Sequence, residues 1–331
     1  ARSIVVVAAL GAAACRFDSD GSETGGGGWE PAEDSGADAS SEPSDASESD
    51  AMSDDDTAGP GSTDAVDDDG DSSGSDEGVE PDDCPRLRVA TNNGGHLNVR
   101  PGPSTDGEAV GELPDNAIVD KIGEAQGEWI DTTDVWFEID SEAFQVAGFV
   151  FSEYVECTTE EAPALAEPDG YWLPLECGMS ATISQGNDGD YSHSGNSRYA
   201  FDFSLGVGTP LVAMADGVVL HRYAETMPGD PCYDGGGEEC YLYANLVVLK
   251  HGDGLRSIYK HLSEVLVEDG AFVARGTAVG LSGSSGYSTG PHAHVMRQEN
   301  CPEPNCPSIP LEFEGIGVPQ TGDTVKSNNC P

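Results

Sequence analysis

From residue 84 onward, short runs of β-favouring residues alternate with glycine-containing turns, and no stretch of helical periodicity interrupts them. Two runs in TPLVAMADGVVLHRY meet at Asp216-Gly217, and the runs NLVVLKHG and RSIYKHLS meet across Asp253-Gly254. Asp-Gly favours the tight turn that joins two antiparallel strands. The pattern therefore predicts a mostly β chain of antiparallel sheet, with a hairpin at each Asp-Gly pair.

The β pattern falls into two parts separated by a short acidic segment that contains Ala and Pro, residues 158–172. Residues 84–157 have the length and strand spacing of a small all-β barrel. Residues 173–331 are expected to form a second, larger antiparallel domain.

The cysteines of the β region are even in number, which favours disulfides in an exported chain. Short loops would be closed by Cys232 with Cys240 and by Cys301 with Cys306. The two domains would each be bracketed by one bridge, the first by Cys84–Cys157 and the second by Cys177–Cys330. No CxxC pair is present, so a cysteine zinc site is rejected.

The first 83 residues are unlike the rest. Residues 1–15 hold one basic residue and an apolar run that ends at Cys15, too short for a membrane span. Residues 17–83 carry 24 of the 61 acidic residues and no Lys or Arg. With almost no large apolar side chains, the segment 16–83 is expected to be a disordered acidic tether. The net charge of −47 argues against nucleic acid as a partner.

Histidines and one aspartate gather in three strings of the second domain, SHSGNSRYAFDF, YKHLS and GPHAHV. In an extended strand His292 and His294 project to one face while Ala293 turns away. Asp202, between Phe201 and Phe203, would point opposite to both rings. A buried carboxylate needs a cation partner. The five candidates together have the composition of a hydrolytic zinc site: His193, Asp202, His261, His292 and His294.

Any one of these histidines alone would more often make a structural hydrogen bond, and it is the clustering that favours a metal site. His96, His221 and His251 lack that context and are expected to be structural or surface residues.

Two strings carry resemblances outside the second domain. Leu-Gly-Ala-Ala-Ala-Cys resembles a bacterial lipoprotein signal, which implies lipidation of Cys15 and an envelope location, or secretion if Cys15 stays unmodified. LNVRPGPST (97–105), with a closing Gly-Phe-Val, resembles bacterial SH3-like domains. Members of that family bind cell-wall peptide or act as spacers. Trp129, Trp136 and Tyr154 are candidates for a ligand groove, with core packing expected for at least one Trp.

Residues from about 173 to 314 resemble the lysostaphin/LytM-type zinc metalloendopeptidases of bacterial cell walls. The matching strings are SHSG…YAFDF, VGTPLVAMADGVV, YKHLS, VEDGAFVARG and GYSTGPHAHV, in the family's order. The resemblance implies that one Zn²⁺ is bound by His193, Asp202 and His294, and that His261 and His292 are catalytic without being ligands. The Ser288-Thr289-Gly290 turn would shape the groove wall.

Two departures from the family pattern stand out. His193 and Asp202 are nine residues apart where the common motif spaces them by four, which we interpret as a loop insertion. His-Ala-His replaces the more usual His-Leu-His and changes only the residue that faces away from the site.

The resemblance implies a zinc endopeptidase that hydrolyses peptide cross-links of peptidoglycan. One alternative is a catalytically inactive envelope regulator that binds and activates other wall hydrolases. Another is a zinc peptidase that acts on proteins. Retention of all five site residues favours an enzyme, and the adjoining β-barrel favours wall as the substrate.

Overall fold

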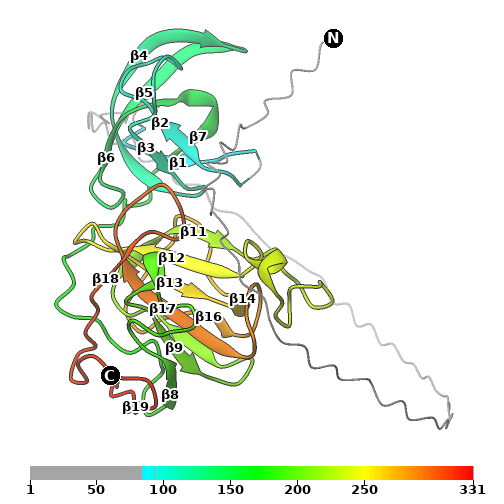
Figure 1. Cartoon of the computed structure of the whole chain (residues 1–331). Coiled ribbons are helices and arrows are strands. Elements are labelled where there is room, and N and C mark those ends of the chain that lie inside the picture. Colours follow the sequence, from blue (N-terminus) through cyan, green and yellow to red (C-terminus); the bar gives the residue numbers. More distant parts are fainter. Residues whose placement is uncertain (1–83, 93, 331) are drawn as a thin grey trace, which may run out of the picture. The chain divides into compact units, whose positions relative to one another are not determined.

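The computed structural model describes residues 84–92 and 94–330. The expected leader with Cys15 and the acidic segment 16–83 lie outside the described residues. Strands dominate, joined by turns and by three short 3₁₀ helices, η1 (Ser152–Tyr154), η2 (Gly195–Ser197) and η3 (Glu238–Cys240) (Figure 1). In the part of the chain that is described, no helix is both long enough and apolar enough to cross a bilayer. The predicted mostly β fold is confirmed.

The N-terminal strands form a five-stranded antiparallel sheet in the order β6-β5-β4-β1-β7, together with a separate β2–β3 pair. Their core is apolar and includes Leu87, Val89 and Ile139. The strand bounds are β1 Arg86–Val89, β2 Leu97–Val99, β3 Gly111–Leu113, β4 Ile118–Ile130, β5 Thr133–Ser141, β6 Val146–Phe151 and β7 Val155–Thr158.

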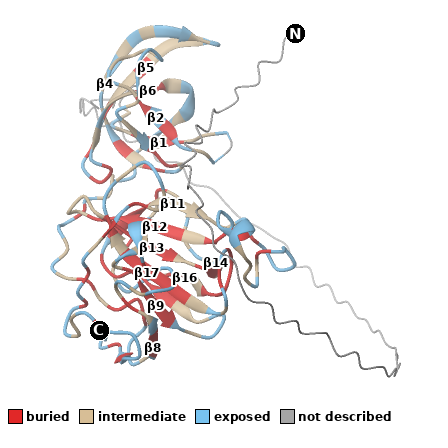
Figure 2. Ribbon diagram, viewed as in Figure 1, coloured by how far each residue is buried: buried red, intermediate tan, exposed pale blue. Residues whose placement is uncertain are grey.

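The C-terminal strands form a nine-stranded antiparallel sheet in the order β15-β11-β12-β13-β17-β9-β8-β19, with β18 paired to β17. Burial is concentrated on its central strands (Figure 2). The bounds are β8 Ser180–Gln185, β9 Phe201–Ser204, β11 Gly217–Tyr223, β12 Leu246–Lys250, β13 Arg256–Lys260, β15 Phe272–Val273, β17 His292–Gln298, β18 Ser308–Ile309 and β19 Thr324–Lys326. A smaller sheet, β10-β16-β14, contains β10 Pro210–Val212, β14 Leu262–Val265 and β16 Ala278–Ser282.

One predicted hairpin is confirmed and the other is wrong. β12 and β13 pair antiparallel on either side of Asp253-Gly254. The runs on either side of Asp216-Gly217 do not pair with each other, because β10 joins β16 in the small sheet while β11 joins β12 and β15 in the large one. Ala213, Met214 and Ala215 between them are buried core, and the exposed Asp216 accepts a hydrogen bond from the Arg275 backbone N–H at 2.6 Å. The chain passes from one sheet to the other at this turn.

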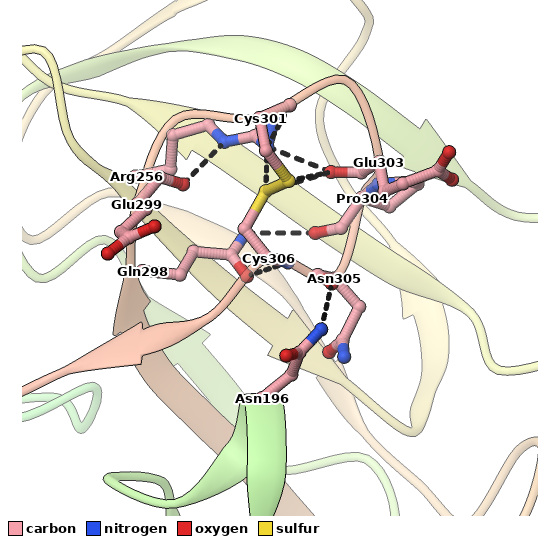
Figure 3. The surroundings of a disulfide bond; sticks show 9 residues. All are labelled: Asn196, Arg256, Gln298, Glu299, Cys301, Glu303, Pro304, Asn305 and Cys306. Carbon is pink, nitrogen blue, oxygen red and sulfur yellow. Dashed lines mark hydrogen bonds between the residues drawn. A yellow bond between two sulfur atoms is a disulfide. The ribbon is translucent and has the colours of Figure 1, made fainter.

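All four predicted disulfides are present: Cys84–Cys157, Cys177–Cys330, Cys232–Cys240 and Cys301–Cys306. The last of these closes a loop held by the buried Arg256 (Figure 3). The Arg256 guanidinium donates to the carbonyl oxygens of Glu299 at 3.3 Å and Glu303 at 2.8 Å, and also to that of Cys301. Backbone carbonyls, rather than a carboxylate, therefore satisfy this cation and fix the loop.

Candidate metal centre

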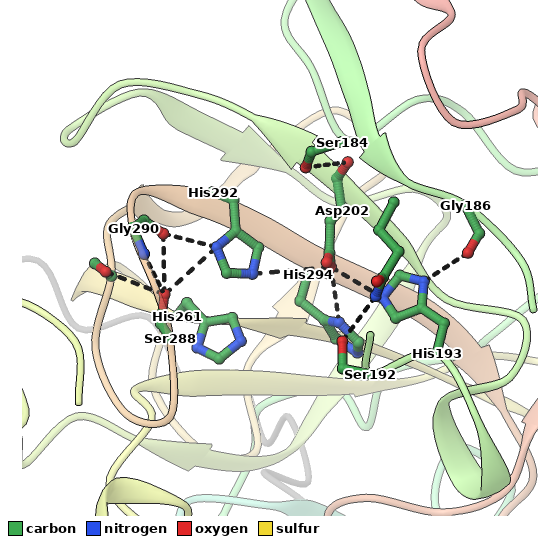
Figure 4. A network of polar contacts seen from close by, with 12 residues as sticks. Ser184, Gly186, Ser192, His193, Asp202, His261, Ser288, Gly290, His292 and His294 are labelled. Carbon is green, nitrogen blue, oxygen red and sulfur yellow. Dashed lines mark hydrogen bonds and ion pairs between the residues drawn. The ribbon is translucent and has the colours of Figure 1, made fainter. Parts of the chain in front are cut away.

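Strand alternation separates the core from the site along β9 and β17. Phe201, Phe203 and Ala293 point into the main hydrophobic core. Asp202 and His294 are register partners across the β9–β17 ladder, so their side chains emerge together on the opposite face. His294 Nδ1 lies 2.9 Å from Asp202 Oδ1 (Figure 4). The orientation expected from the sequence for Asp202 and Ala293 is confirmed.

His193 reaches the same place from the long loop between β8 and η2, so the nine-residue spacing is bridged by loop. Its side chain is buried, and Nδ1 donates to the Gly186 carbonyl oxygen at 2.8 Å. Gln185 steadies the loop by donating from Nε2 to Ser192 Oγ at 2.7 Å. With its proton on Nδ1, His193 turns the lone pair of Nε2 toward Asp202 Oδ1, 3.1 Å away.

His193, Asp202 and His294 fit a metal ion. Each offers one ligand atom, and these atoms lie within 4.8 Å of one another. His193 Nε2 and His294 Nε2 are buried without a hydrogen-bond partner among the described residues. A lone pair facing a carboxylate oxygen in a buried position is stabilised by a cation between them. Two imidazoles and one carboxylate form a donor set typical of zinc.

Electrostatics support an ionised carboxylate here. Burial acts to raise the pKa of Asp202, but contacts with His193 and His294 outweigh burial and hold that pKa well below its usual value. Burial also lowers the pKa of His294 to about 4, so its imidazole is neutral at neutral pH. A carboxylate anion and a neutral imidazole are the protonation states that a metal ligand needs.

His261 and His292 lie beside this triad with their rings 4.6 Å apart, centroid to centroid. His261 Nδ1 donates to the Ser285 carbonyl oxygen at 2.8 Å, and His292 Nδ1 donates to the Gly290 carbonyl oxygen at 2.8 Å. Nδ1 of each ring is therefore engaged, which leaves Nε2 for further contacts. The Nε2 atom of His292 lies 3.9 Å from Asp202 Oδ1. Burial lowers the pKa of His261 well below its usual value, which keeps this ring able to accept a proton.

His261 sits at the junction of β13 and β14 with φ +65°, an uncommon conformation for a residue that has a Cβ. The unusual backbone turns the chain between the two sheets. Sequence reasoning placed His261 at the end of its strand run, and the structure brings it to the same groove as Asp202, His292 and His294, while the buried His193 contacts Asp202.

Four of the five candidates line a groove of about 800 Å³: Asp202, His261, His292 and His294. One wall is the predicted Ser288-Thr289-Gly290 turn, and Tyr191, Tyr241 and Tyr287 also line the groove. The groove further includes Asn305 of the disulfide loop 301–306, whose carbonyl oxygen accepts a hydrogen bond from Asn196 Nδ2 at 3.2 Å.

Sequence reasoning missed Lys260, which also lines the groove. Burial lowers its pKa, and the negative charge of Asp202 opposes that effect. A signal was available in the sequence, because Lys260 adjoins His261 in YKHLS. Two-residue alternation also places Lys260 on the same strand face as Ile258.

The remaining sequence candidates lie elsewhere. His251 is buried and structural, since its ring contacts the Asp216 carbonyl at 2.7 Å and Ser257 Oγ at 2.9 Å. His96 and His221 stack on each other with ring centroids 5.6 Å apart. Trp136 packs in the core against Phe151, as expected for one Trp, whereas Trp129 is exposed and Tyr154 is at the margin of exposure.

The comparisons with known proteins agree with both predicted domains. Residues 196–305 match peptidase family M23, and residues 95–156 match the bacterial SH3 domain. The chain is 35% identical over 137 residues to the glycyl-glycine endopeptidase ALE-1 of Staphylococcus capitis, covering 41% of this chain and 34% of that protein. It is 40% identical over 97 residues to the peptidoglycan DD-endopeptidase ShyA of Vibrio cholerae, covering 28% of this chain and 18% of that protein.

Among solved structures, the catalytic domain of lysostaphin from Staphylococcus simulans is 27% identical and covers 40% of this chain and 88% of that chain, with a TM-score of 0.29. The chain spans about a third or less of the length of the two curated relatives named above. The chain contains a peptidase family M23 domain preceded by a bacterial SH3 domain.

Proposed function

We propose that the protein is a zinc-dependent endopeptidase that hydrolyses peptide cross-links of bacterial peptidoglycan. The observation that carries this proposal is the buried cluster of His193, Asp202 and His294, of which Asp202 and His294 line a groove in the region that matches peptidase family M23. The relatives support the substrate, since ALE-1 is named a glycyl-glycine endopeptidase and ShyA a peptidoglycan DD-endopeptidase.

In this proposal His193 Nε2, Asp202 Oδ1 and His294 Nδ1 hold one zinc ion. Zinc would supply Lewis acidity and lower the pKa of a water molecule toward about 7. His261 or His292 accepts the proton of the attacking water through its free Nε2. The other imidazole, protonated at Nε2 as well as at Nδ1, donates a hydrogen bond to the oxyanion that develops on the scissile carbonyl. The Ser285 and Gly290 carbonyl groups engage the Nδ1–H of the two rings and leave each Nε2 for this chemistry.

The rival proposal of an inactive regulator is less well supported, because the five residues expected of an active site are all present, four of them lining one groove and His193 in contact with Asp202. A regulator has no need for a buried His193 Nε2 whose lone pair faces a carboxylate. Purified full-length protein that binds no zinc when zinc is supplied would favour the regulator.

We propose the following organisation for the chain. A leader at 1–15 carries a lipidated Cys15, and an acidic tether at 16–83 leads to the SH3-like domain at 84–157. A linker at 158–172 joins that domain to the peptidase domain at 173–331. The protein would then act in the cell envelope, anchored at the outer membrane or periplasmic face, or act as a secreted enzyme if Cys15 is unmodified. The SH3-like domain would bind wall peptide or act as a spacer.

The test is digestion of purified peptidoglycan with analysis of the released muropeptides. The wild-type chain should generate new peptide termini, and a chelator or His294→Ala should abolish them. His96→Ala, at an exposed position away from the groove, is the matched control and should retain activity. New termini that persist in both the chelated protein and His294→Ala would contradict the zinc assignment.

A further inference from the structure

Lys260 is the only Lys or Arg among the described residues that line the catalytic groove, and Asp202 is the only acid there. The other polar lining residues, apart from the site histidines, are neutral and belong to Ser, Thr, Asn, Gln and Tyr. Against the net charge of the chain, −47, a single cation in the groove stands out. The group that pairs with the Lys260 ammonium therefore helps to decide which substrate the groove binds.

The register of the sheet fixes where Lys260 points. Lys260 is the cross-strand partner of His294 in the β13–β17 ladder. Directly opposed residues share a face, with Cβ atoms about 4.5–5.5 Å apart. The preceding residue, Tyr259, points the other way, and its hydroxyl accepts a hydrogen bond from the Met214 N–H in the core. Lys260 therefore lies on the groove face, next to the residue proposed as a metal ligand.

Lys260 has no carboxylate partner in the described part of the chain. Its recorded contact is with the ring of Tyr241, whose centroid lies 5.9 Å from Nζ. Asp202 attracts the ammonium at longer range but is already occupied by His193 and His294. Lys250 offers a contrast, because its buried ammonium donates to the Phe144 carbonyl oxygen at 2.5 Å.

We propose that Lys260 binds a free carboxylate of the substrate and makes this groove selective for wall peptides that carry one near the scissile bond, over uncharged glycine bridges. The inference rests on the proposed endopeptidase function. A half-buried ammonium without an anionic partner forms a strong charge-assisted hydrogen bond when a carboxylate reaches it. A glycine bridge offers no charge and would leave the ammonium partly desolvated and unpaired.

The test compares three synthetic cross-linked wall peptides that share one scissile bond. In the first peptide all carboxylates are free, in the second only the terminal carboxylate is amidated, and in the third only the side-chain carboxylates are amidated. The wild-type chain should cleave one of the two amidated peptides about ten- to a hundredfold less efficiently in kcat/KM than the first peptide, in line with hydrogen bonds to charged groups. The carboxylate that is amidated in that poorer substrate is the one that Lys260 binds.

Lys260→Met removes the charge and keeps the length of the side chain, and Lys260→Arg keeps the charge. The methionine variant should lose the preference by lowering kcat/KM only for the peptides that keep the carboxylate bound by Lys260, and the arginine variant should keep most of the preference. An equal loss on all three peptides would overturn the inference, because it would assign Lys260 to the reaction centre or to folding. So would unchanged discrimination in Lys260→Met.

Binding separates this inference from the proposed function. Calorimetry of the full chain in chelator, with the same three peptides, reports charge recognition without hydrolysis. Tighter binding of the free-carboxylate peptide by wild type, lost in Lys260→Met, would support the inference even if no peptide is cleaved. Equal affinities for all three peptides would overturn the inference and leave the proposed hydrolysis untouched.

Discussion

At the scale of single residues, backbone carbonyl groups set the orientation of three imidazoles of the site, those of His193, His261 and His292. Gly186, Ser285 and Gly290 each accept a hydrogen bond from one histidine Nδ1. Side-chain identities were readable from the sequence, because strand alternation places Asp202 opposite to Phe201 and Phe203. The carbonyl partners were not readable, since every residue has a carbonyl and only the folded loops decide which one lies near a ring.

His193 is the site residue with the least usual sequence spacing. Its replacement tests the interpretation that a loop insertion still leaves His193 as a metal ligand. His193→Gln removes one of three proposed ligands. Zinc affinity should fall by at least about 100-fold, since loss of an outer partner of a metal ligand already costs about 10–100-fold. Competition with a chromophoric chelator measures the zinc affinity. His251→Gln, remote from the cluster, should bind zinc as wild type does. Wild-type affinity in His193→Gln would remove His193 from the ligand set.

Tyr259 shows how a buried hydroxyl supports the fold beneath the site. It is fully buried, and burial raises its pKa to about 12. Its oxygen accepts the Met214 N–H at 2.8 Å. Tyr259→Phe leaves that N–H unsatisfied and should lower the free energy of unfolding by about 1–3 kcal/mol. Urea denaturation measures it, and Tyr243→Phe at an exposed position is the control. A loss no larger than in the control would contradict the role.

His251 should make stability depend on pH. Burial lowers its pKa, so the folded chain holds the ring neutral, whereas the unfolded chain protonates it near pH 6.5. The unfolded state then binds more protons below about pH 6.5, and the stabilisation present above that pH is lost as the pH falls. His251→Asn should destabilise the protein most near pH 7.5, with a gap to wild type that narrows toward pH 5. Urea unfolding across that range measures both, and a constant gap would contradict the assignment.

At the scale of elements, the two Asp-Gly turns show what local sequence can and cannot decide. Each dipeptide predicted a turn, and the Asp253-Gly254 turn joins strands that pair. At Asp216-Gly217 the partners lie far away in sequence, since Leu211 pairs with Gly280 and Val218 with Lys250. Turn chemistry reports the reversal of the chain, but sheet membership depends on long-range packing that no short string encodes.

The loop closed by Cys301–Cys306 links stability to the groove, because Asn305 in that loop lines the groove wall. Replacing both cysteines with serine should cost about 2 kcal/mol of unfolding free energy through the entropy of closing a short loop. It should also raise KM more than it lowers kcat, since Asn305 lines the groove wall and is not part of the proposed reaction centre. Peptide kinetics and urea unfolding of the same double variant measure both.

Cys177→Ser with Cys330→Ser is the matched control, since that bridge lies outside the groove lining. This control variant should have a lower free energy of unfolding than wild type. The KM of its folded fraction should change little. Equal changes of KM in the two double variants would show that the 301–306 loop has no direct part in binding.

At the scale of the whole molecule, the positions of the three proposed ligands couple metal binding to folding. His193, Asp202 and His294 come from a loop and two strands that meet only in the folded sheet. A metal bound there stabilises the folded state and not the unfolded chain, in proportion to its free concentration. The Nε2 atom of His193, buried without a hydrogen-bond partner among the described residues, would gain from that cation, so the protein without metal carries a local cost.

Zinc should therefore raise the unfolding temperature of the full chain. With free zinc at about 1,000 times its dissociation constant, the added stability is about 4 kcal/mol. Differential scanning calorimetry in chelator, and after zinc is restored, measures the shift. His294→Ala should unfold at nearly the same temperature in both conditions, which separates specific binding from weak binding of zinc to the acidic surface. Coincident wild-type transitions with and without zinc would contradict the proposed centre, because a ligand that binds only the folded state must shift the equilibrium toward it.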